Sequence, residues 1–349
     1  MIKTPVVLSG LAFVGEELAP LMADIVIEDG RITAIEENPR APPVWICPAF
    51  FNAHTHLGDT LAMDCGVTGD LAALVTPPDG LKHRLLRAAP RSDLLAGMRA
   101  SMEGMIAGGT FGCADFREGG REGVTALREA GHGLPFVSCI FGREGGEMIG
   151  DGAGISSTRD IPDLELIIGA ARRAGKKIAF HAGERDKDDV DAALAFDPDF
   201  IVHATHATRK QLRLCAEKQI PLVVCPRSNW TLGVASSSRH PPLALMEELG
   251  CTVWLGTDNV MFVPPEMQGE MAFVSTVYRM NPTAILRSAV AGSVLAGSPF
   301  FIRAGARANL VLIDPEKTAH KFSRDPVASI VKRLSSATVS KRVFNPDVL

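Results

Sequence analysis

The sequence predicts an α/β protein, a (β/α)8 barrel accompanied by a small β-sandwich domain formed from both termini. From about residue 109 onward, apolar strand-like segments alternate with amphipathic helical segments. This alternation is typical of a parallel sheet covered by helices. Histidine or acidic residues follow several of the strand-like segments. Barrels of this kind carry their active sites at the carboxyl ends of the strands, so the pattern also predicts where the site lies.

The barrel strands are expected in regular order along the chain. The first strand, entered through an apolar run at 44–51, leads into His54, and the others are expected at 110–116, 135–141, 152–157, 177–181, 200–204, 221–225 and 252–256. Helices are expected between them at 122–130, 163–174, 190–196, 208–218 and 242–249. Two longer helical segments, 81–107 (broken at Pro90) and 282–295, lie where barrel helices are extended or added.

The two ends of the chain have a different pattern. Short alternating segments lie at 6–8 and 23–35, and Asp29-Gly30 is a hairpin-turn signal inside the second one. Further strands are expected at 304–314 and within 332–343. We therefore expect a discontinuous β-domain of residues 1–48 and 301–349 beside a catalytic barrel of residues 49–300.

The composition argues against a nucleic-acid-binding protein and against a membrane protein. The chain has 349 residues, 46% of them hydrophobic, and a net charge of −4, so no strong basic field favours nucleic acid as a partner. No apolar run approaches the ~20 residues of a membrane span, and no signal-peptide pattern opens the chain. The seven cysteines lack CxxC spacing, which suits buried thiols in a reducing compartment. We expect a cytoplasmic protein with a small-molecule substrate and no membrane partner. Composition is compatible with either a monomer or a homo-oligomer.

Four residues at predicted strand ends suggest a metal site. His54 and His56, at i and i+2, point to the same side of an extended strand. His181 follows the fifth predicted strand and Asp258 follows the eighth. A lone histidine at a strand end is usually structural, but a barrel brings these ends together. Imidazole and carboxylate ligands suit zinc in a catalytic site with one open position, and iron or manganese are alternatives.

At this point the chain resembles the amidohydrolase superfamily. Within it, the resemblance is to the branch that contains cytosine, guanine, adenosine and S-adenosylhomocysteine deaminases. The resemblance covers residues 45–260 and rests on an ordered set of motifs: His54-Thr55-His56, His181-Ala182-Gly183-Glu184, His203-Ala204-Thr205-His206, Cys225-Pro226-Arg227-Ser228-Asn229 and Gly256-Thr257-Asp258-Asn259. The segment 305–314 in the flanking β-domain is also similar to that branch.

The resemblance implies one divalent metal ion, zinc by preference, held by His54, His56, His181 and Asp258. Members with two metal ions usually add a carboxylated lysine on the fourth strand or, in some, a bridging glutamate. Neither 148–159 nor 135–144 contains a lysine, which favours a single ion.

The same resemblance implies three catalytic roles. A metal ion lowers the pKa of its bound water from ~15.7 to about 7, so hydroxide becomes available to attack an amidine carbon of the substrate. We expect Asp258 to accept a proton from that water and Glu184 to protonate a ring nitrogen, after which ammonia leaves. His203 is expected to orient or polarise the attacking water. Gly183 lets the backbone turn sharply before Glu184.

Several other residues are candidates for substrate binding. Arg117, Arg143 and Arg227 each follow a predicted strand and could bind a carboxylate or phosphate. Pairing with Glu118, Glu122 or Glu144 is the structural alternative. The further candidates are Asn229, His206, which is equally compatible with a structural role, and Asp59.

We therefore predict a metal-dependent hydrolase of C–N bonds other than peptide bonds, an aminohydrolase acting on a purine-, pyrimidine- or related nitrogen heterocycle. The first alternative is a hydrolase of the same fold that cleaves a cyclic amide or a carbon–halide bond. A remote alternative is a non-catalytic scaffold that a metal ion stabilises. The fold alone does not identify the substrate.

Overall fold

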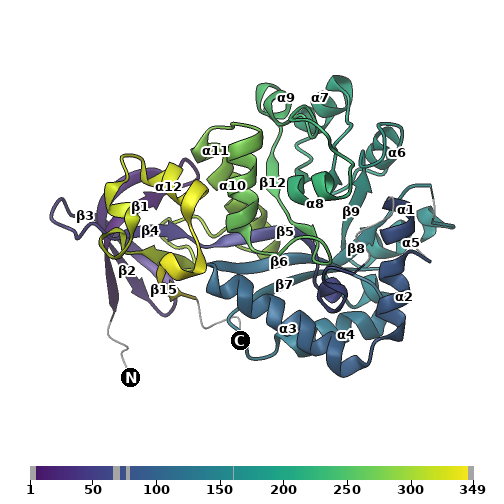
Figure 1. The fold of residues 1–349 in the computed structure, drawn as a ribbon, viewed down its shortest axis with the longest axis horizontal. Helices are drawn as coiled ribbons and strands as arrows, with labels where there is room; N and C mark the ends of the chain where they lie inside the picture. Colours follow the sequence, from purple (N-terminus) through teal and green to yellow (C-terminus); the bar gives the residue numbers. More distant parts are fainter. Residues whose placement is uncertain (1–4, 66–70, 76–78, 160, 345–349) are drawn as a thin grey trace.

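The computed structural model describes residues 5–65, 71–75, 79–159 and 161–344. Two sheets lie side by side along the long axis of the molecule: a curled parallel sheet, and a sheet to which both ends of the chain contribute (Figure 1). The first carries the residues of the predicted site. The second contains the predicted terminal strands.

The curled sheet is TIM-barrel-like, as the sequence predicts. Its nine strands have the order β12-β11-β10-β9-β8-β7-β6-β5-β13, and all neighbours are parallel. They are β5 (Phe50–His56), β6 (Thr110–Arg117), β7 (Val137–Gly142), β8 (Gly152–Ile155), β9 (Lys177–Ala182), β10 (Phe200–His203), β11 (Leu222–Val224), β12 (Val253–Leu255) and β13 (Asp258–Asn259).

The eighth predicted strand consists of two short strands, β12 and β13. They pair with opposite ends of the sheet, so this segment of chain connects those two ends. β12 pairs with β11, whereas β13 pairs with β5. Between them, the backbone N–H of Gly256 donates to the carbonyl of Val224, and the N–H of Thr257 donates to the carbonyl of His54. Asp258 therefore leaves this strand directly beside the histidines of β5.

Helices surround the curled sheet (Figure 1). They are α1 (Leu71–Val75), α2 (Leu81–Ala88), α3 (Arg91–Ala107), α4 (Gly120–Gly131), α5 (Leu164–Arg173), α6 (Val190–Ala195), α7 (Arg209–Glu217), α8 (Pro226–Thr231), α9 (Leu243–Glu248), α10 (Met267–Val277) and α11 (Pro282–Ala291). Helix α12 (Pro326–Arg333) lies beside the terminal sheet and contacts α10 and α11. Short 3-10 turns lie at Leu57–Ala62, Gly146–Met148, Gly292–Ala296, Pro315–Lys317, Ala319–Phe322 and Ser336–Thr338.

The predicted break at Pro90 is confirmed. α2 ends at Ala88, Ala89 adopts ψ 139°, and α3 begins directly after Pro90. The ring of a proline disfavours the helical conformation of the residue before it, so the two helices cannot run on as one. The break matters for the site because it sets the direction of α2 independently of α3.

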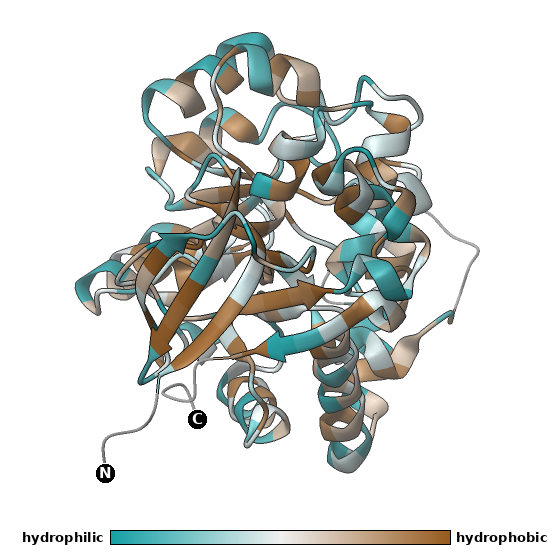
Figure 2. Ribbon diagram, turned by 90° about the vertical axis from the view of Figure 1, so that its left-hand side faces the viewer, coloured by the Kyte–Doolittle hydropathy of each residue, from teal (hydrophilic) through white to brown (hydrophobic). Residues whose placement is uncertain are grey.

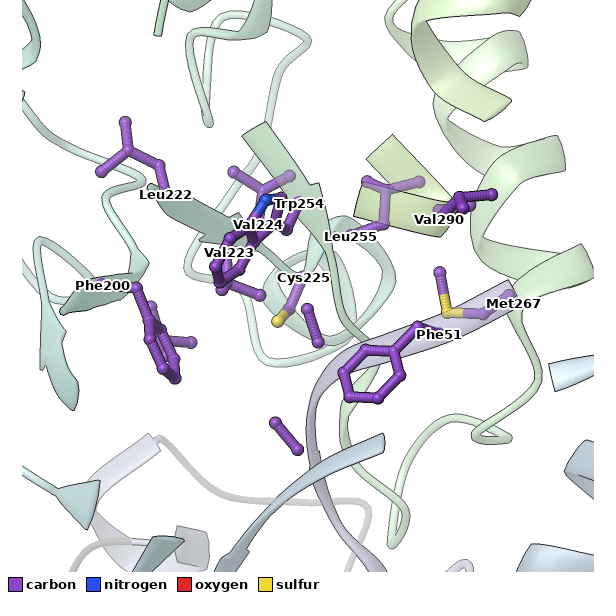
Figure 3. Packing of buried hydrophobic residues seen from close by; sticks show 14 of the residues in the cluster. Phe51, Phe200, Leu222, Val223, Val224, Cys225, Trp254, Leu255, Met267 and Val290 are labelled. Atoms are coloured by element: carbon purple, nitrogen blue, oxygen red, sulfur yellow. The ribbon is translucent and has the colours of Figure 1, made fainter. Parts of the chain in front are cut away.

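The main core fills the space inside the sheet and between the sheet and its helices. In Figure 3, Phe51 of β5 and Met267 of α10 lie below Leu255 of β12 and Val290 of α11, and Val223 of β11 lies farther to the left in the same cluster. All five side chains are buried. Burying a side chain of this size contributes about 1.5–3 kcal/mol, so the barrel strands are fixed by apolar packing, and the polar groups at their ends are held on a rigid frame.

Strands from both termini form the second sheet, with the order β15-β14-β4-β1-β2-β3. Its strands are β1 (Val6–Val14), β2 (Ala19–Glu28), β3 (Arg31–Glu37), β4 (Trp45–Pro48), β14 (Leu310–Ile313) and β15 (Val339–Val343). Asp29 and Gly30 both have positive φ, 45° and 73°, between β2 and β3, which confirms the predicted hairpin turn.

Hydrophobic segments run along the strands of this terminal sheet (Figure 2). Ile25, Ile32, Ile46 and Leu310, which come from four of its strands, belong to one buried cluster. The segment 332–343 yields one strand, β15, after the end of α12. The sequence analysis missed α12, although Asp325 accepts a hydrogen bond from the N–H of Ala328 and Pro326 opens the helix, both of which are start signals.

Candidate functional site

The predicted site residues meet at the carboxyl ends of the barrel strands. His54 and His56 lie in β5, His181 in β9, and His203 ends β10, while Asp258 opens β13. Because parallel strands present their carboxyl ends at one edge, residues far apart in the sequence come into contact here.

Three imidazoles and one carboxylate form a compact cluster. Nε2 of His54 lies 3.1 Å from Oδ1 of Asp258, and Nε2 of His56 lies 3.4 Å from the same oxygen. With His181, these residues each offer one ligand atom, and the four atoms lie within 4.8 Å of one another. Nitrogen and oxygen donors at this spacing can bind a divalent metal ion.

Contacts on the outer side of two imidazoles leave their Nε2 atoms for the cluster. Nδ1 of His181 lies 3.0 Å from the carbonyl oxygen of Ile155, and Nδ1 of His56 lies 3.0 Å from Oε1 of Glu118. Metal-binding histidines usually make such a contact, which fixes the tautomer. Burial lowers the pKa of His54 to about 4 and the pKa of His56 to about 3. Both rings are therefore neutral at physiological pH, as metal ligation requires, and the donor set fits a metal ion.

Asp258 is held from a second side by Ser228, whose hydroxyl donates to Oδ2 at 2.6 Å. Burial alone would raise the pKa of Asp258. The hydrogen bond with His54 and the nearby His203 nevertheless keep that pKa well below its usual range. Asp258 is thus an ionised carboxylate with both oxygens engaged, one toward the histidines and one toward helix α8.

Glu184 and His203 lie next to Asp258 and form a second close group with it. Oε1 of Glu184 is 3.7 Å from Nε2 of His203. Burial raises the pKa of Glu184, although the charge of His203 opposes the rise. A raised pKa favours a carboxyl group that can hold a proton, which is what a general acid needs.

Asn229 orients the ring of His203 from behind. Oδ1 of Asn229 lies 3.2 Å from Nδ1 of His203, and Nδ2 of Asn229 donates to Thr205 at 2.6 Å. These contacts leave Nε2 of His203 toward Glu184. The structure therefore places Asn229 behind a site histidine, whereas the sequence predicted contact with substrate.

The backbone is strained where the site residues leave their strands. His203, Ala204 and Asp258 have φ of 77°, 47° and 63°, a region that residues other than glycine rarely adopt. Such strain tends to collect at functional sites. Gly183 also has positive φ, and a Cβ there would lie 3.0 Å from Cα of Ala204. Glycine therefore permits the predicted turn before Glu184.

A buried ion network lies behind His56. Nζ of Lys82 is 2.9 Å from Oδ2 of Asp59 and 2.8 Å from Oε1 of Glu118. Nη2 of Arg117 donates to Oε2 of Glu118 at 2.7 Å. Burial would lower the pKa of Lys82, but the two carboxylates raise it; burial raises the pKa of Asp59 to about 7. The network joins the strand that carries His56 to helix α2.

The cluster opens into a cavity of about 460 Å³, which His56, His181, Glu184, His203 and Asp258 help to line. Other lining residues include Val75, Lys82, His83, Arg143, Glu147 and Ile161. Nε and Nη2 of Arg143 are buried and make no hydrogen bond with any residue in the described ranges. Of the three predicted arginines, Arg143 is therefore the one that lines the cavity, and its Nε and Nη2 donors are available to a ligand.

Arg227 does not line the cavity. The sequence predicts that it follows the seventh strand and faces the mouth of the site, but Pro226–Thr231 forms helix α8, which buries Ser228 and Asn229 and turns Arg227 toward α10. There, Nε of Arg227 donates to Oε2 of Glu270 at 2.6 Å, and Nη2 donates to the carbonyl of Pro264 at 2.8 Å. Arg227 is therefore in an ion pair away from the cavity, not at its mouth as predicted.

Three more predicted residues lie outside the cavity lining. Arg117 is buried and pairs with Asp115 and Glu118, so the structural alternative describes it. Asp59 contacts Lys82 behind the site. His206 packs against the ring of His240, with centroids 4.9 Å apart.

Lys82 is the site-proximal residue that sequence reasoning missed. It lies in α2, outside the barrel strands and outside every motif, and a lysine on a helix is usually solvated. The position of Glu118 directly after Arg117 suggests an arginine partner, and no pattern in the sequence predicts its contact with His56. No spacing rule in the sequence connects residue 82 with residue 56.

None of the helices in the part of the chain that the structure describes is both long and apolar enough to cross a membrane.

Comparison with known proteins identifies relatives. The profile of the adenosine deaminase family matches residues 150–295, which include β9 through β13. A putative aminohydrolase of Methanothermobacter thermautotrophicus is 35% identical over 379 residues, covering 96% of each chain. A putative aminohydrolase of Archaeoglobus fulgidus is 34% identical and covers 82% of this chain and 83% of its own. A 5-methylthioadenosine/S-adenosylhomocysteine deaminase of Halobacterium salinarum is 26% identical over 96% of this chain and 88% of its own.

Solved structures share the fold. A triazine hydrolase variant superposes with a TM-score of 0.81 at 16% identity, covering 98% of this chain and 94% of that one. Guanine deaminase of C. acetobutylicum, with bound guanine, gives 0.72 at 13% identity, covering 97% and 98%. An adenosine deaminase of Xanthomonas campestris, with bound zinc, gives 0.71 at 15% identity, covering 97% and 90%. Because the chain is 35% identical to a putative aminohydrolase over 96% of each chain, and because a histidine–aspartate cluster lies at its strand ends, it belongs to the amidohydrolase-type family of aminohydrolases.

Proposed function

We propose that this hydrolase deaminates a purine, a pyrimidine or a related nitrogen heterocycle. The observation that carries the proposal is the position of Glu184, beside His203 and Asp258 in the cavity that the metal-type cluster lines. Deamination needs an activated water on one side of a ring carbon and a proton donor for the ring nitrogen. The arrangement supports both requirements.

One divalent metal ion, zinc by preference, would be held by His54, His56, His181 and Asp258. Iron and manganese are compatible with the same donors. The segments 135–144 and 148–159 contain no lysine that could bridge a second ion, which supports a single one. When bound, such an ion supplies Lewis acidity and lowers the pKa of a coordinated water to about 7.

The chain's own residues then divide the proton transfers. Asp258, kept ionised by its hydrogen bonds, accepts a proton from the attacking water. Glu184, with its raised pKa, delivers a proton to the ring nitrogen. His203 is held by Asn229 and points Nε2 into the same space, where it orients the water or the substrate.

Purines are the substrate class that the relatives favour. The names of the relatives include adenine deaminase and 5-methylthioadenosine/S-adenosylhomocysteine deaminase, and a protein of the same fold binds guanine. A cavity of about 460 Å³ lies within the ~300–1,000 Å³ usual for small-molecule sites. If the substrate carries a carboxylate or phosphate, we propose Arg143 as its partner because two of its nitrogens are buried without a protein acceptor.

A second candidate is displacement of a halide, or cleavage of a cyclic amide, in the same cavity. The fold is shared with a triazine hydrolase and with an atrazine chlorohydrolase that binds zinc, the latter with a TM-score of 0.77. A panel of purines, pyrimidines, pterins, adenosyl thioethers and chlorinated triazines separates the candidates. The zinc-loaded protein is expected to release ammonia from an amino-heterocycle. Release of chloride without ammonia, or ring opening of a cyclic amide added to the panel, would favour the alternative. No turnover of any of these compounds would favour a non-catalytic scaffold.

We also propose a division into two domains, a catalytic (β/α)8 barrel at 49–300 and a small β-sandwich at 1–48 and 301–349. The separate buried cluster formed by strands of the terminal sheet supports the second unit. Limited proteolysis tests the division: a fragment of residues 49–300 that retains the bound metal would support it.

A further inference from the structure

Glu118 connects the metal-type cluster to a helix outside the barrel strands. Its Oε1 atom lies 3.0 Å from Nδ1 of His56 and 2.8 Å from Nζ of Lys82. Lys82 belongs to α2, and both Lys82 and His83 line the cavity. One carboxylate oxygen thus contacts the imidazole of a proposed ligand and the ammonium group of a cavity wall.

We propose that Lys82 is a positioning residue for the metal site: its ammonium group holds Glu118 in the orientation that fixes the ring of His56. Lys82 thereby also ties helix α2 to that ring. The inference rests on the proposed function, because it assumes that His56 binds a metal ion.

The geometry of Glu118 explains why a second cation matters. Arg117 donates to Oε2 of Glu118 at 2.7 Å, so a single arginine fixes one end of the carboxylate. Lys82 fixes the other end, at the oxygen that faces His56. Without Lys82, the carboxylate can rotate about its contact with Arg117, and the oxygen that lies 3.0 Å from Nδ1 of His56 moves. Partners of this kind orient the ligand, and their loss weakens metal binding.

The structural alternative is that Lys82 only neutralises Asp59. The side chain of Asp59 is fully buried, and that of Lys82 is 3% exposed. A buried carboxylate that loses its cation destabilises the fold regardless of any metal. The two roles separate when the charge of Asp59 is removed first, because Asp59→Asn leaves no buried charge for Lys82 to neutralise except that of Glu118.

The experiment compares Lys82→Met, Asp59→Asn and the Asp59→Asn/Lys82→Met double variant with the parent chain. Lys218→Met is the matched control, because Lys218 forms an exposed pair with Asp197 at 3.1 Å. For each metal-free protein, Zn²⁺ affinity is measured by chelator competition and the unfolding midpoint in urea is recorded. The visible absorption after loading with Co²⁺ reports the ligand geometry.

Both proteins that carry Lys82→Met are expected to bind Zn²⁺ about 10–100-fold more weakly than their lysine-containing counterparts and to show an altered Co²⁺ spectrum. Asp59→Asn and Lys218→Met are expected to stay close to the parent in affinity. The double variant is expected to have a lower urea midpoint than Asp59→Asn, because Glu118 loses one of its two cations, but to remain folded without urea. Lys82→Arg, which keeps a cation, is expected to recover part of the lost affinity.

Equal Zn²⁺ affinity in Asp59→Asn and in the double variant would overturn the inference. A double variant that fails to fold would also overturn it, since Lys82 would then be needed for folding itself. If Lys82→Met alone fails to fold, the comparison of the double variant with Asp59→Asn still decides. A parent chain that binds no Zn²⁺ would instead remove the proposed function, and this result precedes any comparison of variants.

Discussion

Oε1 of Glu184 lies 3.7 Å from Nε2 of His203, beyond the reach of a good hydrogen bond, in the wall of the cavity. A tight ion pair would keep Glu184 ionised. The observed separation, with burial that raises the pKa of Glu184, leaves its carboxyl group able to hold a proton for a substrate. The relationship between these two residues is therefore the geometric basis of the deaminase proposal.

Glu184→Gln tests the proton transfer. The substitution keeps the shape and hydrogen bonding of the side chain but removes the titrating proton. We expect kcat to fall by about 10²–10⁴-fold, the usual contribution of a general acid or base. Metal content should stay at the parent level, because Glu184 lies outside the proposed ligand set.

The matched control is Glu217→Gln, at an exposed position of α7, which should leave kcat unchanged. A near-normal kcat in Glu184→Gln would mean that another group carries the proton, and the deaminase proposal would lose its main support.

His56→Ala tests the ligand set. Removal of one of four donors weakens both the affinity and the geometry of a metal site, so we expect the metal content after gel filtration to fall sharply. Elemental analysis measures it, with His132→Ala, at an exposed position, as the control. Two tightly bound ions in the parent chain would contradict the single-ion proposal.

The barrel and the metal-type cluster could be predicted because they depend on local patterns. The apolar strands of a parallel sheet are distinctive, and the i, i+2 spacing of His54 and His56 fixes their common side. Once the strands are in order, the topology alone brings His181 and Asp258 to them. None of these steps requires knowledge of side-chain contacts.

The surroundings of the cluster could not be predicted in the same way. Whether Arg227 faces substrate depends on a six-residue helix and on Glu270, which lies in a helix that the sequence analysis missed. The role of Lys82 depends on where α2 packs. Both features depend on contacts between segments far apart in the sequence, which residue spacing does not encode. An arginine after a strand has the same local sequence pattern whether or not it forms an ion pair.

Ser228→Ala tests the control of Asp258. Ser228 donates to Oδ2 of Asp258 at 2.6 Å, and a bond to the charged form of a carboxylate lowers its pKa. Without this donor, the pKa of Asp258 rises, and the ionised form is lost at a higher pH. We expect the acidic limb of the kcat/KM profile to move to higher pH. The rate at neutral pH should change little through this effect, because the pKa of Asp258 starts well below its usual range.

Thr231→Ala serves as the control for Ser228→Ala. Thr231 lies on the same helix, and its hydroxyl donates to the backbone carbonyl of Arg227 at 2.9 Å, at an exposed position. Its pH profile should match that of the parent. An unmoved acidic limb in Ser228→Ala would show that the hydrogen bond does not control the ionisation of Asp258.

Arg143→Met tests recognition of an anionic group. Charge-assisted hydrogen bonds contribute roughly 1.5–3 kcal/mol each, so KM for a substrate with a carboxylate or phosphate should rise about ten- to a hundredfold. A neutral analogue should be nearly unaffected, because the lost contact involves only the anion. An equal rise for both substrates would assign Arg143 to the shape of the cavity.

Arg227→Met is expected to affect stability and not substrate recognition. The side chain of Glu270 is fully buried, and Nε of Arg227 donates to it at 2.6 Å. Loss of one partner of a buried ion pair leaves an uncompensated charge and costs about 3–5 kcal/mol. Urea unfolding should show a lower midpoint in Arg227→Met. Arg209→Met, which breaks the exposed pair with Glu248, should change the midpoint little.

The loss should also depend on pH. Burial raises the pKa of Glu270 and Arg227 opposes the rise, so the pKa in Arg227→Met should be higher still. A group whose pKa is raised in the folded state loses stability as the pH increases through that value. The destabilisation of Arg227→Met should therefore be small in acid and grow toward neutral pH, and Arg227→Met/Glu270→Gln should remove this dependence. If Arg227→Met instead changed KM only for anionic substrates and left the urea midpoint unchanged, Arg227 would be a substrate-binding residue, as the sequence predicts.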